Sequence, residues 1–142
     1  MKINFPFTVL ILIFIFLSSN VNANNPSYFI DAKKLFEKKD FEKSKLLFEK
    51  DIVFNPKREK SYLYLAKIFN KKENDVEEEI NLNNVLLLNP ENDEALYMLI
   101  LIKIKQSDYH KVEKLIEQFT LVCKNFCSKK TEIKKKFNKL TP

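Results

Sequence analysis

The sequence predicts an all-α protein, and three observations carry this prediction. Apolar residues recur at a spacing close to 3.6 after residue 24, as they do on one face of a helix. The chain of 142 residues contains no glycine, so it lacks the Asn-Gly and Asp-Gly dipeptides that join hairpin strands. The dipeptide Asn-Pro occurs twice and places Pro56 and Pro90 34 residues apart. A return at this interval predicts a repeated pair of helices.

The first 23 residues are predicted to form a secretory signal peptide that is cleaved after Ala23. Lys2 supplies a positive charge, residues 5–17 are apolar, and the polar stretch that follows ends in Val21-Asn22-Ala23. The apolar run is shorter than the roughly 20 residues that a membrane-spanning helix needs. An uncleaved membrane anchor is the alternative. We therefore expect an exported protein, periplasmic or secreted, with one domain after residue 23.

The composition limits the classes of partner. The formal net charge is +6, which is typical of proteins that bind acidic partners or anionic membranes. The chain is also rich in Lys, Asn, Ile and Phe, a bias that AT-rich coding sequence produces, so the charge is weak support for such a partner. The absence of glycine argues against phosphate-binding loops. Export argues against a nucleic-acid partner.

The clearest motif begins the predicted second repeat. Its aromatic, leucine, small and aromatic residues stand at the spacing that lets two helices cross closely: Tyr62, Leu65, Ala66 and Phe69. The matching residues 34 positions earlier are Tyr28, Asp31, Ala32 and Leu35. Those 34 positions later are Leu96, Leu99, Ile100 and Lys103. The pattern is therefore strongest in the middle of the chain and weaker on both sides.

A second helix is predicted after each of these segments. In the first repeat it begins at Asp40-Phe41 and places Ser44, Phe48 and Ile52 on its inward face. In the third repeat Asp108-Tyr109 begins a helix whose inward residues are Val112, Ile116 and Phe119. In the second repeat Glu78 occupies the position of a small residue. Either that helix rotates to expose Glu78, or its register slips by about one residue.

These motifs and their period resemble the tetratricopeptide repeat (TPR) family across residues 24–127. The resemblance implies a right-handed α-solenoid of about three helix hairpins, with repeats at about 25–58, 59–92 and 93–126. The alternative is a helical bundle without repeats. Residues 128–142 are predicted to form a basic C-terminal capping helix, with Ile133, Phe137 and Leu140 facing inward. An amphipathic helix that binds anionic lipid is the other interpretation of this segment.

Cys123 and Cys127 are the two cysteines of the chain. In an exported protein such a pair is most simply a disulfide, and here it would fix the capping helix to the third repeat. Bridging at this spacing predicts that the helix breaks at Lys124-Asn125. Thiol exchange would need Cys-x-x-Cys beside a sheet. A zinc site would need more ligands than two cysteines and His110 provide, so no metal is expected.

No catalytic residues and no cofactor are predicted. His110 is the single histidine, and no nucleophile pattern accompanies it, so we expect it to be an exposed helix residue. The prediction is accordingly a protein that is not an enzyme.

The TPR resemblance implies a concave groove built from the first helix of each repeat. Its residues would be Phe29, Lys33, Phe36, Leu63, Lys67, Asn70, Tyr97, Leu101 and Ile104. This mixture of basic and apolar side chains predicts binding of an acidic-hydrophobic segment of another envelope or secreted protein. The predicted function is an adaptor or assembly factor. The alternative is an anionic membrane-surface or polyanion binder that uses the Lys-rich C-terminal helix.

Overall fold

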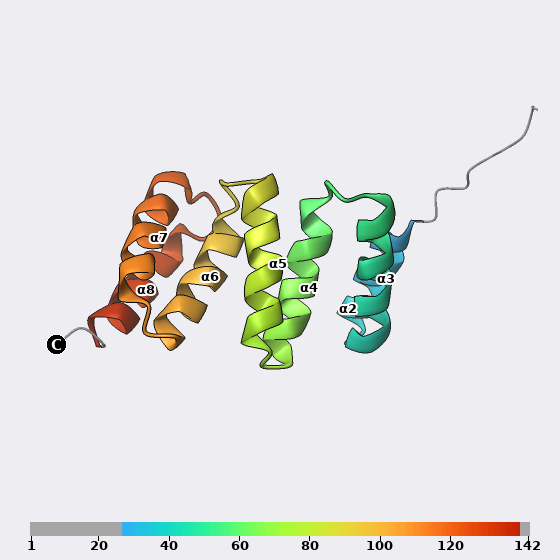
Figure 1. The fold of residues 1–142 in the computed structure, drawn as a ribbon, viewed down its shortest axis with the longest axis horizontal. Coiled ribbons are helices and arrows are strands. Elements are labelled where there is room, and N and C mark those ends of the chain that lie inside the picture. Colours follow the sequence, from blue (N-terminus) through green and yellow to red (C-terminus); the bar gives the residue numbers. More distant parts are fainter. Residues whose placement is uncertain (1–26, 140–142) are drawn as a thin grey trace, which may run out of the picture.

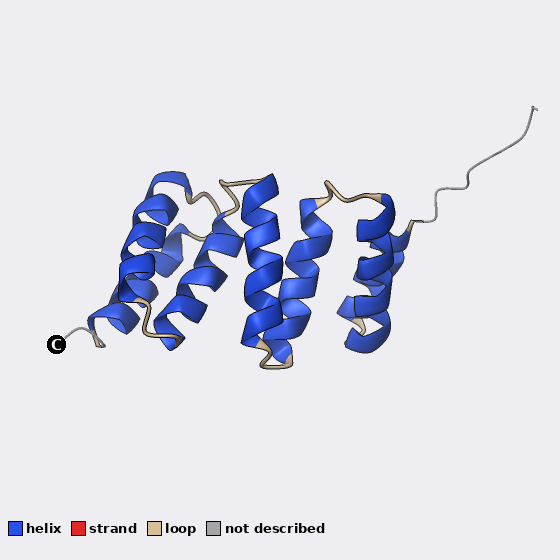
Figure 2. Cartoon of the chain, viewed as in Figure 1, coloured by secondary structure: helices blue, strands red, loops and turns tan. Residues whose placement is uncertain are grey.

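The structure is a computed structural model that describes residues 27–139, and these residues form a row of helix hairpins (Figure 1). The described part of the chain contains helices and loops but no strand (Figure 2). Its helices are α2 (Tyr28–Glu37), α3 (Phe41–Phe54), α4 (Glu59–Lys71), α5 (Asp75–Leu88), α6 (Asp93–Lys105), α7 (Tyr109–Val122), the 3₁₀ turn η1 (Cys127–Lys129) and α8 (Lys130–Asn138). The hairpins stack into a right-handed α-solenoid, which confirms the predicted fold class. The predicted signal peptide and Leu140 lie outside the described residues.

Four helices begin at a side chain that caps them. Oxygens of Asp40, Asn74, Asn92 and Asp108 accept hydrogen bonds from the backbone amide three residues later, at 3.3, 3.2, 2.9 and 3.2 Å. Each bond satisfies one of the amides that the first turn of a helix leaves without a partner. The second helices of all three repeats therefore begin at the residues that the sequence marks as helix starts.

The turn inside each hairpin contains a residue with left-handed backbone geometry. Lys39, Glu73 and Ser107 have φ values of 63°, 55° and 59°. They are 34 residues apart, and each directly precedes the residue that caps the second helix. Glycine takes this geometry without a steric penalty, but the chain has no glycine. The repeat thus imposes one conformation on three unrelated side chains.

The core has two parts. The first joins the second and third repeats to α8 and includes Leu82, Leu96, Phe119 and Ile133, all of which are fully or almost fully buried. The second lies in the first repeat and the adjoining face of α4, and it is largely aromatic. There the Tyr64 ring stacks on the Phe48 ring, with 4.9 Å between centroids and 11° between planes. This aromatic stacking attaches the first repeat to the second.

The structure corrects the prediction for the second helix of the middle repeat. Glu78 is 1% exposed, and Leu82 and Val85 on the same helix are fully buried. The helix therefore keeps the repeat register and neither rotates nor slips. Burial is tolerated because the Asn70 amide donates to both Glu78 carboxylate oxygens, at 3.1 Å each. Glu78 occupies the position that Ser44 fills in the first repeat and Val112 in the third.

A second buried carboxylate connects the first repeat to the second. Asp51 is fully buried, whereas its neighbour Ile52, predicted to face inward, is half-buried. The Asp51 carboxylate accepts hydrogen bonds from Ser61 Oγ at 2.5 Å, Arg58 Nη1 at 2.6 Å and Asn55 Nδ2 at 3.1 Å. Because its lone pairs are used and its charge is matched by Arg58, Asp51 can be buried between α3 and α4.

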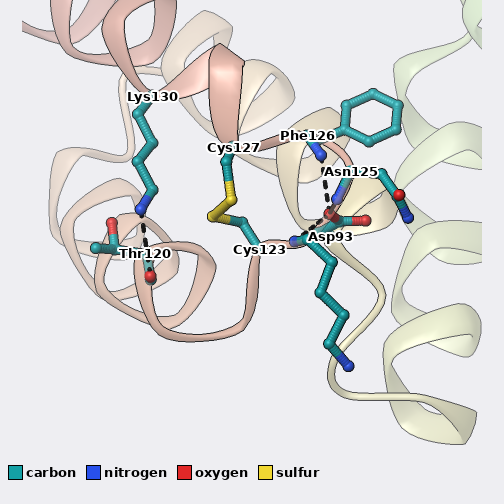
Figure 3. The surroundings of a disulfide bond; sticks show 8 residues. Asp93, Thr120, Cys123, Asn125, Phe126, Cys127 and Lys130 are labelled. Atoms are coloured by element: carbon teal, nitrogen blue, oxygen red, sulfur yellow. Dashed lines mark hydrogen bonds between the residues drawn. A yellow bond between two sulfur atoms is a disulfide. The ribbon is translucent and has the colours of Figure 1, made fainter.

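The C-terminal end is joined to the third repeat by a disulfide and a hydrogen-bonded loop (Figure 3). Helix α7 ends at Val122, and Cys123 and Cys127 are bonded with their Cα atoms 5.2 Å apart. Helix α8 then packs on α6 and α7 and buries Ile133. None of the helices within residues 27–139 is long and apolar enough to cross a bilayer.

Candidate binding groove

A cavity of about 500 Å³ lies between the first helices of the three repeats. It is open to solvent along one side. Its walls come from α2, α4 and α6, and α5 contributes one residue. The lining residues are Phe36, Lys67, Asn70, Lys71, Glu78, Glu94, Tyr97, Met98 and Leu101.

Helical spacing explains why these side chains face the same space. The α6 residues Glu94, Tyr97, Met98 and Leu101 follow one another at intervals of three, one and three, which places them on one face of a helix. The α4 residues Lys67, Asn70 and Lys71 show the same pattern over one turn. Parallel stacking of α4 and α6 in adjacent hairpins then turns these two faces toward a shared groove.

Five of the nine groove residues expected from the sequence line this cavity, namely Phe36, Lys67, Asn70, Tyr97 and Leu101. The other four lie elsewhere. Leu63 and Ile104 are mostly buried in the core, and Phe29 packs on the Phe48 and Tyr64 rings. Lys33 is exposed, and its ammonium lies 3.7 Å from the Glu37 carboxylate. A peptide-binding role for any of the nine stays a prediction.

The apolar wall of the groove is held in place by ring contacts. The Phe36 ring lies edge-on to the Phe41 and Tyr64 rings, at centroid distances of 5.4 and 5.0 Å. The Tyr97 hydroxyl donates to Glu132 at 3.0 Å, so α8 fixes this ring from behind. Burial, together with the Glu132 carboxylate, raises the pKa of Tyr97. These rings are therefore fixed before any ligand arrives, which lowers the entropic cost of binding.

The polar wall carries both signs of charge. Lys67 Nζ donates to Glu94 at 2.9 Å, and both side chains are about three-quarters buried. The same ammonium lies 5.2 Å from the centre of the Tyr64 ring. The sequence analysis named Lys67 but missed Glu94, although Glu94 lies one turn before Tyr97 on the same helical face. Lys67 and Lys33 are thus both ion-paired, which removes the ground for expecting a strongly basic groove.

Glu78 is the second residue that sequence reasoning placed incorrectly, and it forms part of the groove floor. It reaches the cavity from α5, below Asn70 of α4. Burial raises the pKa of Glu78, the Asn70 amide lowers it, and the nearby Asp75 charge raises it again, with a net upward shift. The groove therefore contains a buried carboxylate that no side chain of residues 27–139 neutralises through an ion pair.

A smaller cavity of about 310 Å³ lies at the start of α6, beside Asp93 and Phe126. Its central carboxylate is already engaged. Asp93 Oδ2 accepts hydrogen bonds from the backbone amides of Lys124, Asn125 and Phe126, at 2.7, 2.6 and 2.9 Å. Burial raises the pKa of Asp93, but these three bonds outweigh burial and leave the pKa lowered. This cavity is a structural junction between α6 and the disulfide loop.

The described residues offer few groups for other chemistry. His110 is exposed on α7. Within residues 27–139, no group of three or more His, Cys, Asp or Glu side chains is placed to hold a metal ion.

Comparison with solved structures identifies the fold. The TPR2B domain of yeast Sti1, in its complex with pHsp70, superposes with a TM-score of 0.65 at 18% identity, over 80% of this chain and 93% of that domain. The first TPR of Spaghetti (RPAP3), bound to the HSP90 peptide SRMEEVD, gives 0.72 at 13% identity, over 87% and 100%. The protein has the tetratricopeptide-repeat fold. The CopN–Scc3 complex contains a further TPR-like match, with a TM-score of 0.62 at 14% identity over 89% and 84%.

The likeness lies in structure and does not extend to sequence. No family model matches the chain, and no curated protein matches its sequence. At 13–18% identity the solved structures show the TPR fold alone. Residue roles in this TPR protein are therefore argued from its own side chains.

Proposed function

We propose that this TPR protein is a non-enzymatic protein-interaction module that binds a peptide segment of another protein in the groove between α2, α4 and α6. The carrying observation is the cavity of about 500 Å³, whose apolar wall is fixed by ring contacts and whose polar wall offers charged side chains. Apolar sites with a few placed polar groups are typical of ligand-binding sites. Two of the similar solved structures contain a bound Hsp70 or HSP90 partner, which supports a peptide as the kind of ligand.

We propose the cell envelope as the setting, with the protein either periplasmic or secreted. The N-terminal segment, expected to be cleaved after Ala23, is one support. The Cys123–Cys127 disulfide is the other, because disulfides persist in oxidising compartments. N-terminal sequencing of the protein recovered from its host tests this part of the proposal. A mature chain that begins at Met1 would contradict it.

Site-specific crosslinking in the host tests the groove. A photo-reactive amino acid at Leu101 lies inside the groove, and the same amino acid at Leu87 lies on α5, where the side chain is 80% exposed and outside the lining. We expect one defined partner to crosslink from position 101 and not from position 87. The full chain with Leu101→Arg should then lose that partner, whereas Leu87→Arg should retain it.

Two outcomes would contradict the proposed site. Crosslinks from position 87 alone would place the interaction on the outer face. A partner that is retained by Leu101→Arg, with the variant folded by circular dichroism, would exclude the groove.

The alternative function, binding to an anionic membrane surface or another polyanion, depends on α8. Ile133 is buried against the third repeat, so the apolar side of α8 is already covered and is not free to insert into lipid. Lys134, Lys135 and Lys139 remain exposed, which leaves an electrostatic attraction as the possible mode. Co-sedimentation with phosphatidylserine vesicles tests this mode. Binding that is lost on changing these three lysines to glutamate would favour the alternative.

A further inference from the structure

We propose that Glu78 forms a cation subsite in the floor of the groove, where it takes the ammonium or guanidinium group of a basic side chain on the bound peptide. The proposal rests on the proposed peptide-binding function and adds the chemistry of the ligand. It differs from the acidic partner that the lysine content of the sequence suggests.

The first observation is the length of the side chain. Ser44 and Val112 occupy the same repeat position as Glu78, and both are fully buried. Packing between the two helices of a hairpin is therefore satisfied by a short side chain. The additional length of Glu78 carries its carboxylate past the packing position to the cavity wall. A charged group in that place is not explained by the fold.

The second observation is that the carboxylate is buried and incompletely matched. Glu78 is 1% exposed, and its side-chain hydrogen bonds both come from one nitrogen, Asn70 Nδ2. A carboxylate has about four lone-pair sites, so acceptor capacity remains. Burial of a charge without an ionic partner is unfavourable unless a cation or a proton arrives.

The third observation is that the lysines of the groove are held by other groups. Lys67 is bonded to Glu94. Lys71 Nζ lies 5.7 Å from the centre of the Phe41 ring. From α6, Lys105 pairs with Asp75 at 2.5 Å. These contacts direct the ammonium groups away from Glu78, so the position beside the carboxylate is left for a group from outside.

Access to this position runs past Asn70, which is an exposed residue on the groove face of α4. Its side-chain oxygen accepts no hydrogen bond among the described contacts. An incoming ammonium or guanidinium could donate to that oxygen and to Glu78 together, while its aliphatic stem packs on Met98 or Leu101. A long basic side chain with apolar neighbours therefore fits the groove better than an acidic one.

The test uses the full chain and a library of N-acetylated, C-amidated heptapeptides in which each position in turn is varied over all residues. Capped ends remove the terminal charges that would compete for the site. We expect one position to prefer Lys or Arg over Glu by about tenfold or more. Glu78→Gln should abolish this preference while leaving binding that depends on apolar residues. Glu113→Gln, on the exposed face of α7, is the matched control and should retain the preference.

A second readout is the ionisation of Glu78 itself, followed by carbon NMR of its carboxyl group. A bound cation stabilises the carboxylate, so the preferred peptide should lower the pKa of Glu78. The groups that face Glu78 and could alter this value are Asp75, Lys105, Lys67, Lys71 and Glu94. A norleucine substitution at the basic position of the peptide should leave the pKa where it is in the free protein.

The outcomes separate the two proposals. Peptide binding that shows no preference for Lys or Arg, or a preference that survives Glu78→Gln, overturns the cation subsite and leaves the proposed function standing. Absence of binding to every peptide, or binding that Leu101→Arg does not affect, overturns the groove function and the subsite with it.

Discussion

Asp93 at the start of α6 accepts a hydrogen bond from the backbone amide of Asn125 at 2.6 Å, across 32 positions of the chain. The same carboxylate oxygen accepts from the two neighbouring amides, Lys124 and Phe126. The loop that the disulfide closes thus folds around one carboxylate (Figure 3). This contact places α8, and through α8 the Tyr97 ring in the groove wall.

Replacement of Asp93 should therefore destabilise the C-terminal end. We expect Asp93→Ala to lower the free energy of unfolding by about 2 kcal/mol, because hydrogen bonds to a charged acceptor are lost and one side of the loop is left without a partner. Asp93→Asn keeps one acceptor oxygen and should cost about half as much. Urea unfolding measures both. An Asp93→Ala protein as stable as the parent would show that the loop is held by the disulfide alone.

The stabilisation by Asp93 should also depend on pH. The pKa of Asp93 is lowered in the folded protein, so the contribution is present above the pKa of the unfolded chain, about 3.9. It is lost as the pH falls below that value and through the folded pKa. The difference in stability between the parent and Asp93→Asn should accordingly shrink as the pH is lowered from 5 toward 2. A constant difference over this range would contradict the assignment of the charged form.

The disulfide and Asp93 act on the same five-residue loop, so their effects should not add. We expect the Cys123→Ser and Cys127→Ser double variant to lose about 2 kcal/mol or less, because the closed loop is short. Combining it with Asp93→Ala should cost less than the sum of the two changes, since either change already loosens the loop. Unfolding of all three variants in urea provides the double-mutant cycle. Full additivity would mean that the two contacts stabilise separate elements.

The sequence was sufficient for the fold because the repeat period is carried by packing residues. Ala32 and Ala66 are fully buried where the helices cross, and Leu99 is almost fully buried, as their positions in the repeat predict. The predicted ends of α4, α5 and α6 agree with the structure. Residues whose environment depends on spacing within one helix are thus the ones that the pattern places correctly.

The groove was predicted less well because it depends on contacts between repeats. Glu94 was missed as the partner of Lys67, 27 residues earlier, and no periodicity reports such a pair. Asp51 and Glu78 were not recognised as buried, because the donors that make their burial tolerable, Ser61 and Asn70, come from the facing helix. A buried charge can be inferred only when its partner is known.

The left-handed residues give a prediction about stability that contacts alone would not suggest. An L-residue in this geometry costs roughly 1–2 kcal/mol, and glycine removes that cost while adding backbone entropy to the unfolded chain. We expect Lys39→Gly and Ser107→Gly each to raise the free energy of unfolding by about 0.5–1 kcal/mol. Lys38→Gly is the matched control, because Lys38 has a φ of −78°, and it should be neutral or destabilising. Destabilisation by all three would show that these side chains contribute more than their backbone strain costs.

Glu78 should make the protein less stable at neutral pH than a neutral isostere would. Its pKa is raised by burial first and by the Asp75 charge, so the folded protein favours the protonated form. A raised pKa contributes stability that is fully present below the pKa of the unfolded chain, about 4.3, and is lost as the pH rises through the folded value.

Glu78→Gln should therefore be more stable than the parent at pH 7, by on the order of 1 kcal/mol, and equal to it near pH 3. Thermal unfolding across this range measures the difference, with Glu113→Gln as the exposed control. If Glu78→Gln were destabilised at pH 7, the carboxylate would have to be stabilised within the free protein. The groove floor would then need no cation from a ligand. A gain in stability that comes with a loss of preference for basic peptides would instead show that Glu78 is kept for binding at the expense of the fold.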